Sequence, residues 1–328
     1  MSGAQPPQAA PMTAPIAAPM TAPAATNPVA RFWDGDVAYG FRRSPVAIAS
    51  ALVLLVLLAG SMLAPWIAPY NPFDLASLNL MDSLQPPAWA ADGTREHLLG
   101  TDNQGRDMLS AIMHGTRISF IVGFASVLFA VLVGIAVGLL AGYAGGAADA
   151  ALMRLADVQL SFPAILIALL VDGVVTAALP RDMHEALQLY VVVFAIGISF
   201  WPQFARTVRG STLVERGKEY VMAAKVIGLS GPRIMLTHIL PNVLGPVLVV
   251  GTLTLGLAVV TEATLSFLGV GLPANKLSIG TLIRVGQDFL FSGEWWVTIF
   301  PGLALVLMVL SINLLGDWLR DALNPRLR

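Results

Sequence analysis

Polar segments divide the chain into six apolar stretches, each long enough to cross a bilayer, which takes about 20 helical residues. Asp157, Gln159 and Pro163 interrupt the third stretch, and Pro202 marks the end of the fourth. The pattern predicts an all-α integral membrane protein with six transmembrane helices. These helices are expected at residues 46–67, 118–140, 152–171, 187–204, 243–268 and 297–315.

Composition agrees with this class of protein. Hydrophobic residues make up 56% of the chain and charged residues 12%, whereas soluble domains carry about 25% charged residues. The net charge of −1 gives no argument for nucleic-acid binding. Cysteine is absent, which excludes disulfides, thiolate metal sites and cysteine nucleophiles.

The distribution of Lys and Arg predicts the orientation, because cytoplasmic segments carry more of them. With a cytoplasmic N-terminus, the inner segments hold thirteen of the 19 basic residues and the outer segments hold six. We therefore expect both termini in the cytoplasm. The expected organisation is a disordered tail at 1–44, a first transmembrane helix at 45–68, an extracytoplasmic loop at 69–115, a five-helix core at 116–320 and a C-terminus at 321–328.

The second half of the long outer loop predicts a helix that leads into the second span. Asp102 or Asn103 is the expected N-cap of that helix. A calcium site is the alternative use of Asp102, Asn103 and Asp107, but their spacing does not follow an EF-hand. Near the far end of the chain, Trp295 and Trp296 predict an aromatic belt at the outer membrane interface.

A charged loop at 206–242 lies between the fourth and fifth spans. Within it, Tyr220, Ala223, Ala224 and Ile227 recur at the spacing of one helix face. A helix this short cannot bury its apolar face alone, so we expect a partner protein at this loop. The loop is basic, since only Glu215 and Glu219 oppose Arg206, Arg209, Arg216, Lys218, Lys225 and Arg233.

The run Ala223-Ala224, Gly228 and Leu240-Pro241 resembles the EAA loop, the coupling element in permease subunits of ATP-binding-cassette importers. Met222 stands where that family pattern has Glu. His238 stands at an apolar position of the pattern, as is common in the peptide-transporter branch.

Three further segments resemble the dipeptide, oligopeptide and nickel permeases of this family. They are GTDNQGRD with the following GTRIS, the run TEATLSFLGVG, and the C-terminal NLLGDWLRDALNPRLR. The motifs occur in the family's order, and the resemblance extends over residues 97–328.

The resemblance implies a type I importer permease fold. It also implies a homologous second permease, two ATPase subunits that bind the ATP, and an extracytoplasmic solute-binding protein. Peptides are the expected cargo, with nickel or another small solute as the alternative. The implied ATPase-coupling residues are Lys218, Glu219, Tyr220, Ala223, Ala224, Lys225, Gly228, Leu229 and Pro241.

Glu262 lies within the fifth apolar stretch, where a charge facing lipid is costly. Two roles remain open for it: a structural hydrogen bond, or a place on the translocation path. The rival class of protein, an ion-coupled secondary transporter, would use Glu262 as its coupling site. Such carriers show paired broken helices in two repeats, and the hydropathy shows no such symmetry.

The chain lacks the motifs of several enzyme classes. No GxxxxGK[ST] sequence is present, so no Walker A loop is expected to bind ATP, and no cofactor is expected in this chain. The histidines His97, His114, His184 and His238 are scattered without ligand spacing, so no metal site is expected. We therefore expect a transport subunit and not an enzyme.

Overall fold

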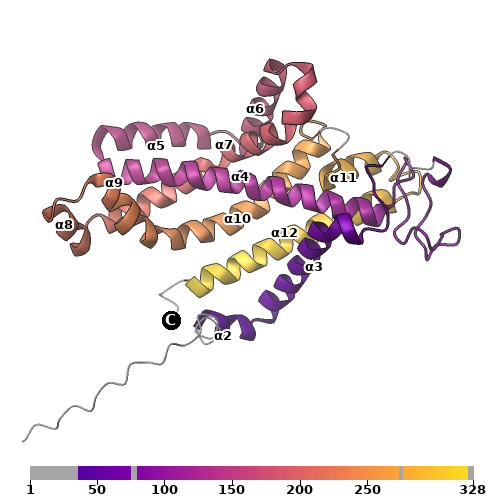
Figure 1. The fold of residues 1–328 in the computed structure, drawn as a ribbon, viewed down its shortest axis with the longest axis horizontal. Helices are drawn as coiled ribbons and strands as arrows, with labels where there is room; N and C mark the ends of the chain where they lie inside the picture. The colour runs from indigo at the N-terminus through magenta and orange to yellow at the C-terminus, as the bar shows by residue number, and fades with distance from the viewer. Residues whose placement is uncertain (1–35, 75–79, 273–275, 324–328) are drawn as a thin grey trace, which may run out of the picture.

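The structure, a computed structural model, describes residues 36–74, 80–272 and 276–323. These residues form helices joined by loops, with one isolated β-bridge between Thr101 and Asp107. The predicted all-α fold is confirmed for this part of the chain (Figure 1). The elements are α2 (Asp36–Arg43), α3 (Pro45–Ile67), the 3₁₀ turn η1 (Leu80–Asp82), α4 (Met108–Ala144), α5 (Gly146–Leu160), α6 (Ala164–Ala178), α7 (Arg181–Glu215), α8 (Glu219–Val226), α9 (Gly231–Ile234), the π-helix η2 (Met235–Ile239), α10 (Leu240–Phe267), α11 (Ile279–Gln287) and α12 (Trp296–Leu323).

Five helices of the described residues are long and apolar enough to cross a membrane. They are α3, α4, α7, the continuous run of α9, η2 and α10, and α12. The expected third span is wrong as a single helix, because α5 and α6 meet at an angle of 93°. Pro163 causes the break: its ring disfavours the helical conformation of the residue before it, and α6 starts directly after it.

Pro202 does not end the fourth span, contrary to the sequence prediction, and α7 continues to Glu215. A proline inside a helix leaves the carbonyl four residues earlier without its N–H donor. Here that carbonyl belongs to Ile198, and the side-chain amide of Gln159 in α5 donates to it. The indole of Trp201 donates in turn to Oε1 of Gln159 at 2.8 Å. A side chain from the neighbouring helix therefore satisfies the carbonyl that the proline leaves free.

Helices α4 and α7 lie along one another over most of their length (Figure 1). The contact face of α4 is the glycine series Gly134, Gly138 and Gly142. A Cβ on Gly138 would lie 2.6 Å from the carbonyl oxygen of Ala205 and 2.6 Å from Cβ of Val208. The two backbones are thus too close for any side chain at this position, as is common where helices pack in lipid.

Ionic contacts fasten one end of this bundle. Arg209 of α7 binds Asp149 of α5 through two bonds, Nε–Oδ1 at 2.5 Å and Nη2–Oδ2 at 2.7 Å. Arg216 donates from Nη1 to the carbonyl of Gly142 at 2.9 Å, close to the C-terminus of α4. Basic side chains are favourable at a helix C-terminus, where carbonyls have no partner within the helix.

The loop at the opposite end packs onto α4 and α12. Asp107 is the N-cap of α4 and accepts the N–H of Ser110 at 2.8 Å. The predicted cap at Asp102 or Asn103 is wrong, because Asp102 instead accepts the N–H groups of Gln104 and Arg106 and closes a turn. Trp296 is buried and donates to the carbonyl of Thr101 at 3.1 Å, so of the two tryptophans of the predicted belt Trp295 is the exposed one.

Candidate functional site

Of the segment 206–242, expected as a loop, residues 206–215 continue α7 and residues 240–242 begin α10. The residues between them form the end of the molecule furthest from α11, where α8 projects beyond α4 and α7 (Figure 1). The helix expected from the sequence is present but ends at Val226. Gly228 has a φ of +81°, and its N–H bonds the carbonyl of Lys225 while the N–H of Leu229 bonds that of Ala224. This is the Schellman termination of a helix, which needs a left-handed residue at the position of Gly228.

One face of α8 packs against the rest of the protein. Val221 and Ala224 are buried, in one cluster with Ile234 and Ile239 of the segment that leads into α10. Burying a side chain the size of valine contributes about 1.5–3 kcal/mol. Helix α8 is therefore held to the base of α10 by a small apolar contact.

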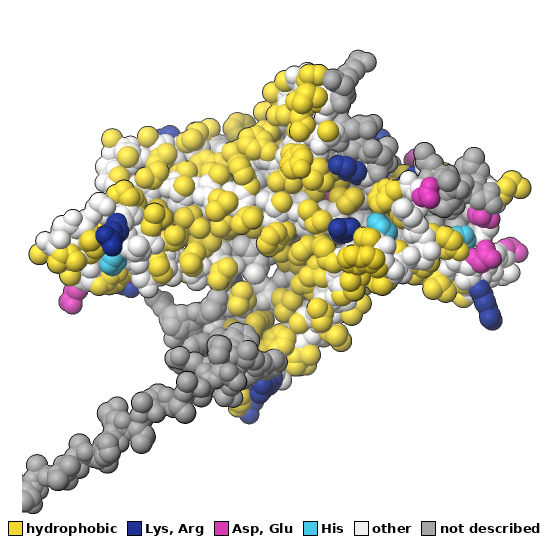
Figure 2. Space-filling view, viewed as in Figure 1, with side chains coloured by type: hydrophobic (Ala, Val, Ile, Leu, Met, Phe, Trp, Pro, Cys, Tyr) yellow, Lys and Arg dark blue, Asp and Glu magenta, His cyan; other side chains and the backbone are white. Residues whose placement is uncertain are grey.

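The opposite face of α8 is apolar and exposed. Met222 is 49% exposed, Ile227 74% and Val226 87%. The predicted face of Tyr220, Ala223, Ala224 and Ile227 is divided, since Ala224 points inward and Ile227 outward. Figure 2 shows hydrophobic side chains at this end beside basic ones and a histidine. Exposed apolar surface at the polar end of a membrane protein is typical of a protein contact.

A polar network joins α7, α8 and α10. Glu215, the last residue of α7, accepts a hydrogen bond from Lys218 Nζ at 2.7 Å and from the Tyr220 hydroxyl at 2.5 Å. Asn242 in the first turn of α10 donates from Nδ2 to the Tyr220 oxygen at 3.2 Å and to the His238 carbonyl at 2.8 Å. Tyr220 therefore stands between the end of one predicted span and the start of the next.

The tyrosine remains a hydrogen-bond donor over the physiological pH range. Partial burial, and next the Glu215 carboxylate, raise the pKa of Tyr220 to about 12. Both effects disfavour the phenolate, which would lie beside a second negative charge. The Tyr220 hydroxyl is thus protonated at neutral pH and able to donate to Glu215.

The segment between Gly228 and α10 is irregular. Met235–Ile239 forms a π-helix, and Pro241, which has no N–H, lies in the first turn of α10. Short π-helical segments inside α-helices are often found at functional sites. Here the π-helix lies where the charged loop leads into the fifth span.

Glu262 is fully buried at the other end of α10. Its Oε1 accepts the Ser266 hydroxyl at 2.8 Å, and Ser119 of α4 and Ser278 beside α11 also approach the carboxyl group. Ser119 also accepts the N–H of Ile279 at 3.2 Å. Glu262 therefore lies where α4, α10 and α11 meet, which favours the structural alternative. Its path-lining role stays a prediction.

Within the described residues, no group of three or more His, Asp or Glu side chains could hold a metal ion. Among the network residues, sequence reasoning missed Glu215 and Asn242 as partners of Tyr220. Glu215 was visible only as one of two acidic residues in a basic loop, since its contact depends on the turn between α7 and α8.

Comparison with known proteins identifies the family to which this fold and charged loop belong. The family described as "Binding-protein-dependent transport system inner membrane component" matches residues 134–328, which include the charged loop, α8 and Glu262. The chain belongs to this family. A second family, "N-terminal TM domain of oligopeptide transport permease C", matches residues 31–87 of the permease, which include α3. The permease is accordingly a multi-pass inner-membrane protein, as its apolar helices indicate.

Several named relatives are similar to the permease over nearly its whole length. The "Di/tripeptide transport system permease protein DppC" of Pseudomonas aeruginosa is 35% identical, over 92% of this chain and 93% of its own. The "Dipeptide transport system permease protein DppC" of Haemophilus influenzae is 36% identical, over 93% and 97%. Its namesake in Escherichia coli K12 is 39% identical, over 92% and 94%.

A solved structure supports the fold independently. The permease superimposes on a chain from "Inward facing conformations of the MetNI methionine ABC transporter" with a TM-score of 0.52 and 20% identity. The match covers 66% of this chain and 98% of that chain. The expected permease fold of an ATP-binding-cassette importer is thus confirmed.

Proposed function

We propose that this permease imports di- or oligopeptides as one of two membrane-spanning halves of an ATP-driven, binding-protein-dependent importer. The named peptide permeases that cover over nine-tenths of the chain support this cargo over nickel or another small solute. ATP is bound by two partner ATPases, and an extracytoplasmic binding protein delivers the peptide. Both termini and the end with α8 face the cytoplasm, because most Lys and Arg residues lie on that side.

The observation that carries this proposal is the exposed apolar face of α8. Met222, Val226 and Ile227 have no contact that buries them, although they lie outside the expected membrane spans. These three side chains bind the surface of an ATPase subunit, and Lys218 and Lys225 supply the charges that flank the contact. Met222 replaces the Glu of the family pattern, so here the contact depends on a flexible apolar side chain and not on a carboxylate.

The inner face of α8 supplies the route of coupling. Movement of the ATPases displaces α8, and the packing of Val221 and Ala224 transmits that displacement to the segment below α10. The bond between Tyr220 and Glu215 transmits it to α7 at the same time. Gly228 allows the chain to reverse direction after α8, and the segment from Leu229 to Pro241 connects that turn to α10. Spans four and five then alternate access to the translocation path.

The experiment is co-purification of the full chain from its native membrane, with the wild type and a Val226→Asp variant. A charge at this 87% exposed position disrupts an apolar contact without touching the core. We expect the wild type to retain a Walker-motif ATPase and a second six-span permease, and the variant to lose the ATPase alone. Met81→Asp is the matched control, since Met81 is 88% exposed in the loop at the opposite end.

Retention of the ATPase by Val226→Asp at the wild-type level would contradict the docking role of α8. Recovery of the wild-type chain without any ATPase would contradict the proposed function as a whole. Peptide uptake by the same strains then separates peptides from nickel as cargo.

A further inference from the structure

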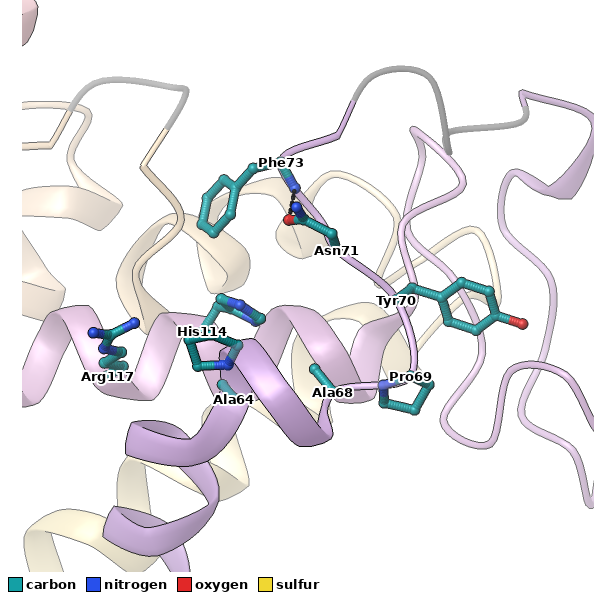
Figure 3. Close-up of a pocket in the computed structure, with 9 residues that line it drawn as sticks. Ala64, Ala68, Pro69, Tyr70, Asn71, Phe73, His114 and Arg117 are labelled. Atoms are coloured by element: carbon teal, nitrogen blue, oxygen red, sulfur yellow. Dashed lines mark hydrogen bonds between the residues drawn. The ribbon is translucent and has the colours of Figure 1, made fainter.

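A cavity of about 360 Å³ lies between the C-terminal end of α3 and the first turns of α4. Figure 3 shows that Ala64 and Ala68 lie at the C-terminal end of α3. His114 and Arg117 project from α4 toward the loop segment that carries Asn71 and Phe73. The cavity therefore has an apolar wall on one helix and a basic wall on the other. Its volume suits a small headgroup and not a folded partner.

Arg117 has no ion-pair partner among the residues that the structure describes. Its Nε is buried without a hydrogen-bond acceptor. A guanidinium group does not lose its charge in a protein, and the half-buried Arg117 therefore holds one shielded N–H donor that an anion in the cavity would satisfy. The partner that would satisfy the Nε donor of Arg117 is an oxygen atom that carries negative charge.

His114 is oriented toward the same space. Its Nδ1 lies 3.0 Å from the carbonyl oxygen of Ser110, so this nitrogen donates and Nε2 is left for another contact. The ring of Phe73 packs edge-on against the imidazole, with 5.4 Å between centroids, and restricts its rotation. A basic side chain and a fixed imidazole thus share one cavity with apolar walls.

The depth of the cavity in the bilayer identifies its occupant. Arg117 directly precedes the apolar run of the second span, and the apolar run of the first span ends at Ile67. Trp66, which follows the cavity-lining Pro65 in the sequence, is 79% exposed, as is typical of a residue at the membrane–water boundary. Both helices therefore place the cavity at the level of lipid headgroups, where phosphates are far more concentrated than any solute.

We propose that this cavity binds the phosphate of an anionic phospholipid, with Arg117 as the counter-charge. Guanidinium groups bind phosphate oxygens through paired, charge-assisted hydrogen bonds. The glycerol and upper acyl carbons lie against Ala64, Pro65 and Ala68 at the end of α3. The lipid joins α3 to α4 at a place where the two helices leave a gap between them.

The test uses the full-length chain, purified in detergent with any subunits that accompany it and titrated with phosphatidylglycerol under native mass spectrometry. We expect Arg117→Gln to weaken phosphatidylglycerol binding roughly tenfold, the value of one lost charge-assisted interaction. Arg95→Gln is the matched control, because Arg95 is an exposed arginine outside the cavity, and it is expected to bind as the wild type does. Phosphatidylcholine measures binding that does not depend on net lipid charge.

A second variant keeps the test independent of folding at Arg117. Ala68→Leu fills the cavity and leaves Arg117 in place, and we expect it to weaken lipid binding as well. Equal binding by wild type, Arg117→Gln and Ala68→Leu would overturn the proposal. Displacement of the lipid by millimolar inorganic phosphate or by a dipeptide would also overturn it, in favour of a free-anion or peptide site. None of these readouts depends on transport, so failure of the lipid proposal can be distinguished from failure of the proposed import function.

Discussion

The Tyr220 hydroxyl donates to Oε2 of Glu215 at 2.5 Å and thereby joins α8 to the last residue of α7. Asn242 donates to the same hydroxyl oxygen, so one side chain connects the ends of two spans to the short helix between them. Because of these two bonds, we expect the end of α7, the helix α8 and the start of α10 to move together.

Tyr220→Phe removes this bond and leaves the packing of α8 unchanged. Glu215 is nearly buried, and a hydrogen bond to a charged group contributes about 1.5–3 kcal/mol. We expect ATPase subunits to remain bound while peptide uptake per ATP hydrolysed falls several-fold. Tyr190→Phe is the control, since Tyr190 is 66% exposed, and it is expected to behave as the wild type. Unchanged uptake in Tyr220→Phe would show that the bond transmits nothing.

Gly228→Val tests the turn that ends α8. No atom lies within 4 Å of an added Cβ, so the cost arises from the φ of +81° and not from a clash. That conformation costs about 1–2 kcal/mol for a residue with a Cβ, and more for a branched one. We expect ATP hydrolysis to continue with little peptide uptake, measured side by side in vesicles.

Two matched glycine variants separate conformation from bulk. Gly228→Asn is expected to retain most uptake, because asparagine tolerates the left-handed region. Gly217→Ala, in the neighbouring turn, meets only one atom at 3.7 Å and has no positive φ, so it is expected to be neutral. Full uptake by Gly228→Val would remove Gly228 from the coupling route.

Gly138→Ala tests the contact between α4 and α7. The new Cβ would lie 2.6 Å from Val208 Cβ, so the helices must separate, at a cost of about 1–3 kcal/mol. We expect a lower Tm in detergent. Gly251→Ala on α10, with nothing within 4 Å, is expected to leave Tm unchanged or slightly raised. Equal Tm values for the two variants would mean that α4 and α7 are less closely packed than described.

Glu262→Gln separates the two roles that the sequence left open. The glutamine oxygen still accepts the Ser266 hydroxyl, so a structural role predicts near-normal folding and ATP-driven uptake. Glu262→Val removes the acceptor among Ser119, Ser266 and Ser278, and is expected to lower both. A Glu262→Gln variant that folds normally but cannot transport would instead place the carboxylate on the translocation path.

The sequence predicts those elements whose signal is local. The first apolar stretch, 46–67, corresponds to α3 at Pro45–Ile67, and the glycine series of α4 lies at the contact with α7. Gly228, part of the EAA-like run, has a φ of +81° and forms the turn that ends α8, a role for which glycine is the usual residue. Each of these follows from hydropathy or backbone preference within a few residues.

The features that the sequence did not predict depend on a neighbour in space. Pro202 is tolerated inside α7 because Gln159, from another helix, supplies the missing donor. The same pair of residues gives no sequence pattern, because 43 positions separate Gln159 from Pro202. The contact of Glu215 with Tyr220 likewise depends on how the turn after α7 folds back.

The most direct test of the account is peptide uptake into proteoliposomes that contain the purified complex, with ATP supplied only on the side that α8 faces. We expect labelled dipeptide uptake that requires this ATP and the binding protein, continues without any ion gradient, and is abolished by Val226→Asp. Uptake driven by a proton or sodium gradient in the absence of ATP, and unaffected by Val226→Asp, would contradict it.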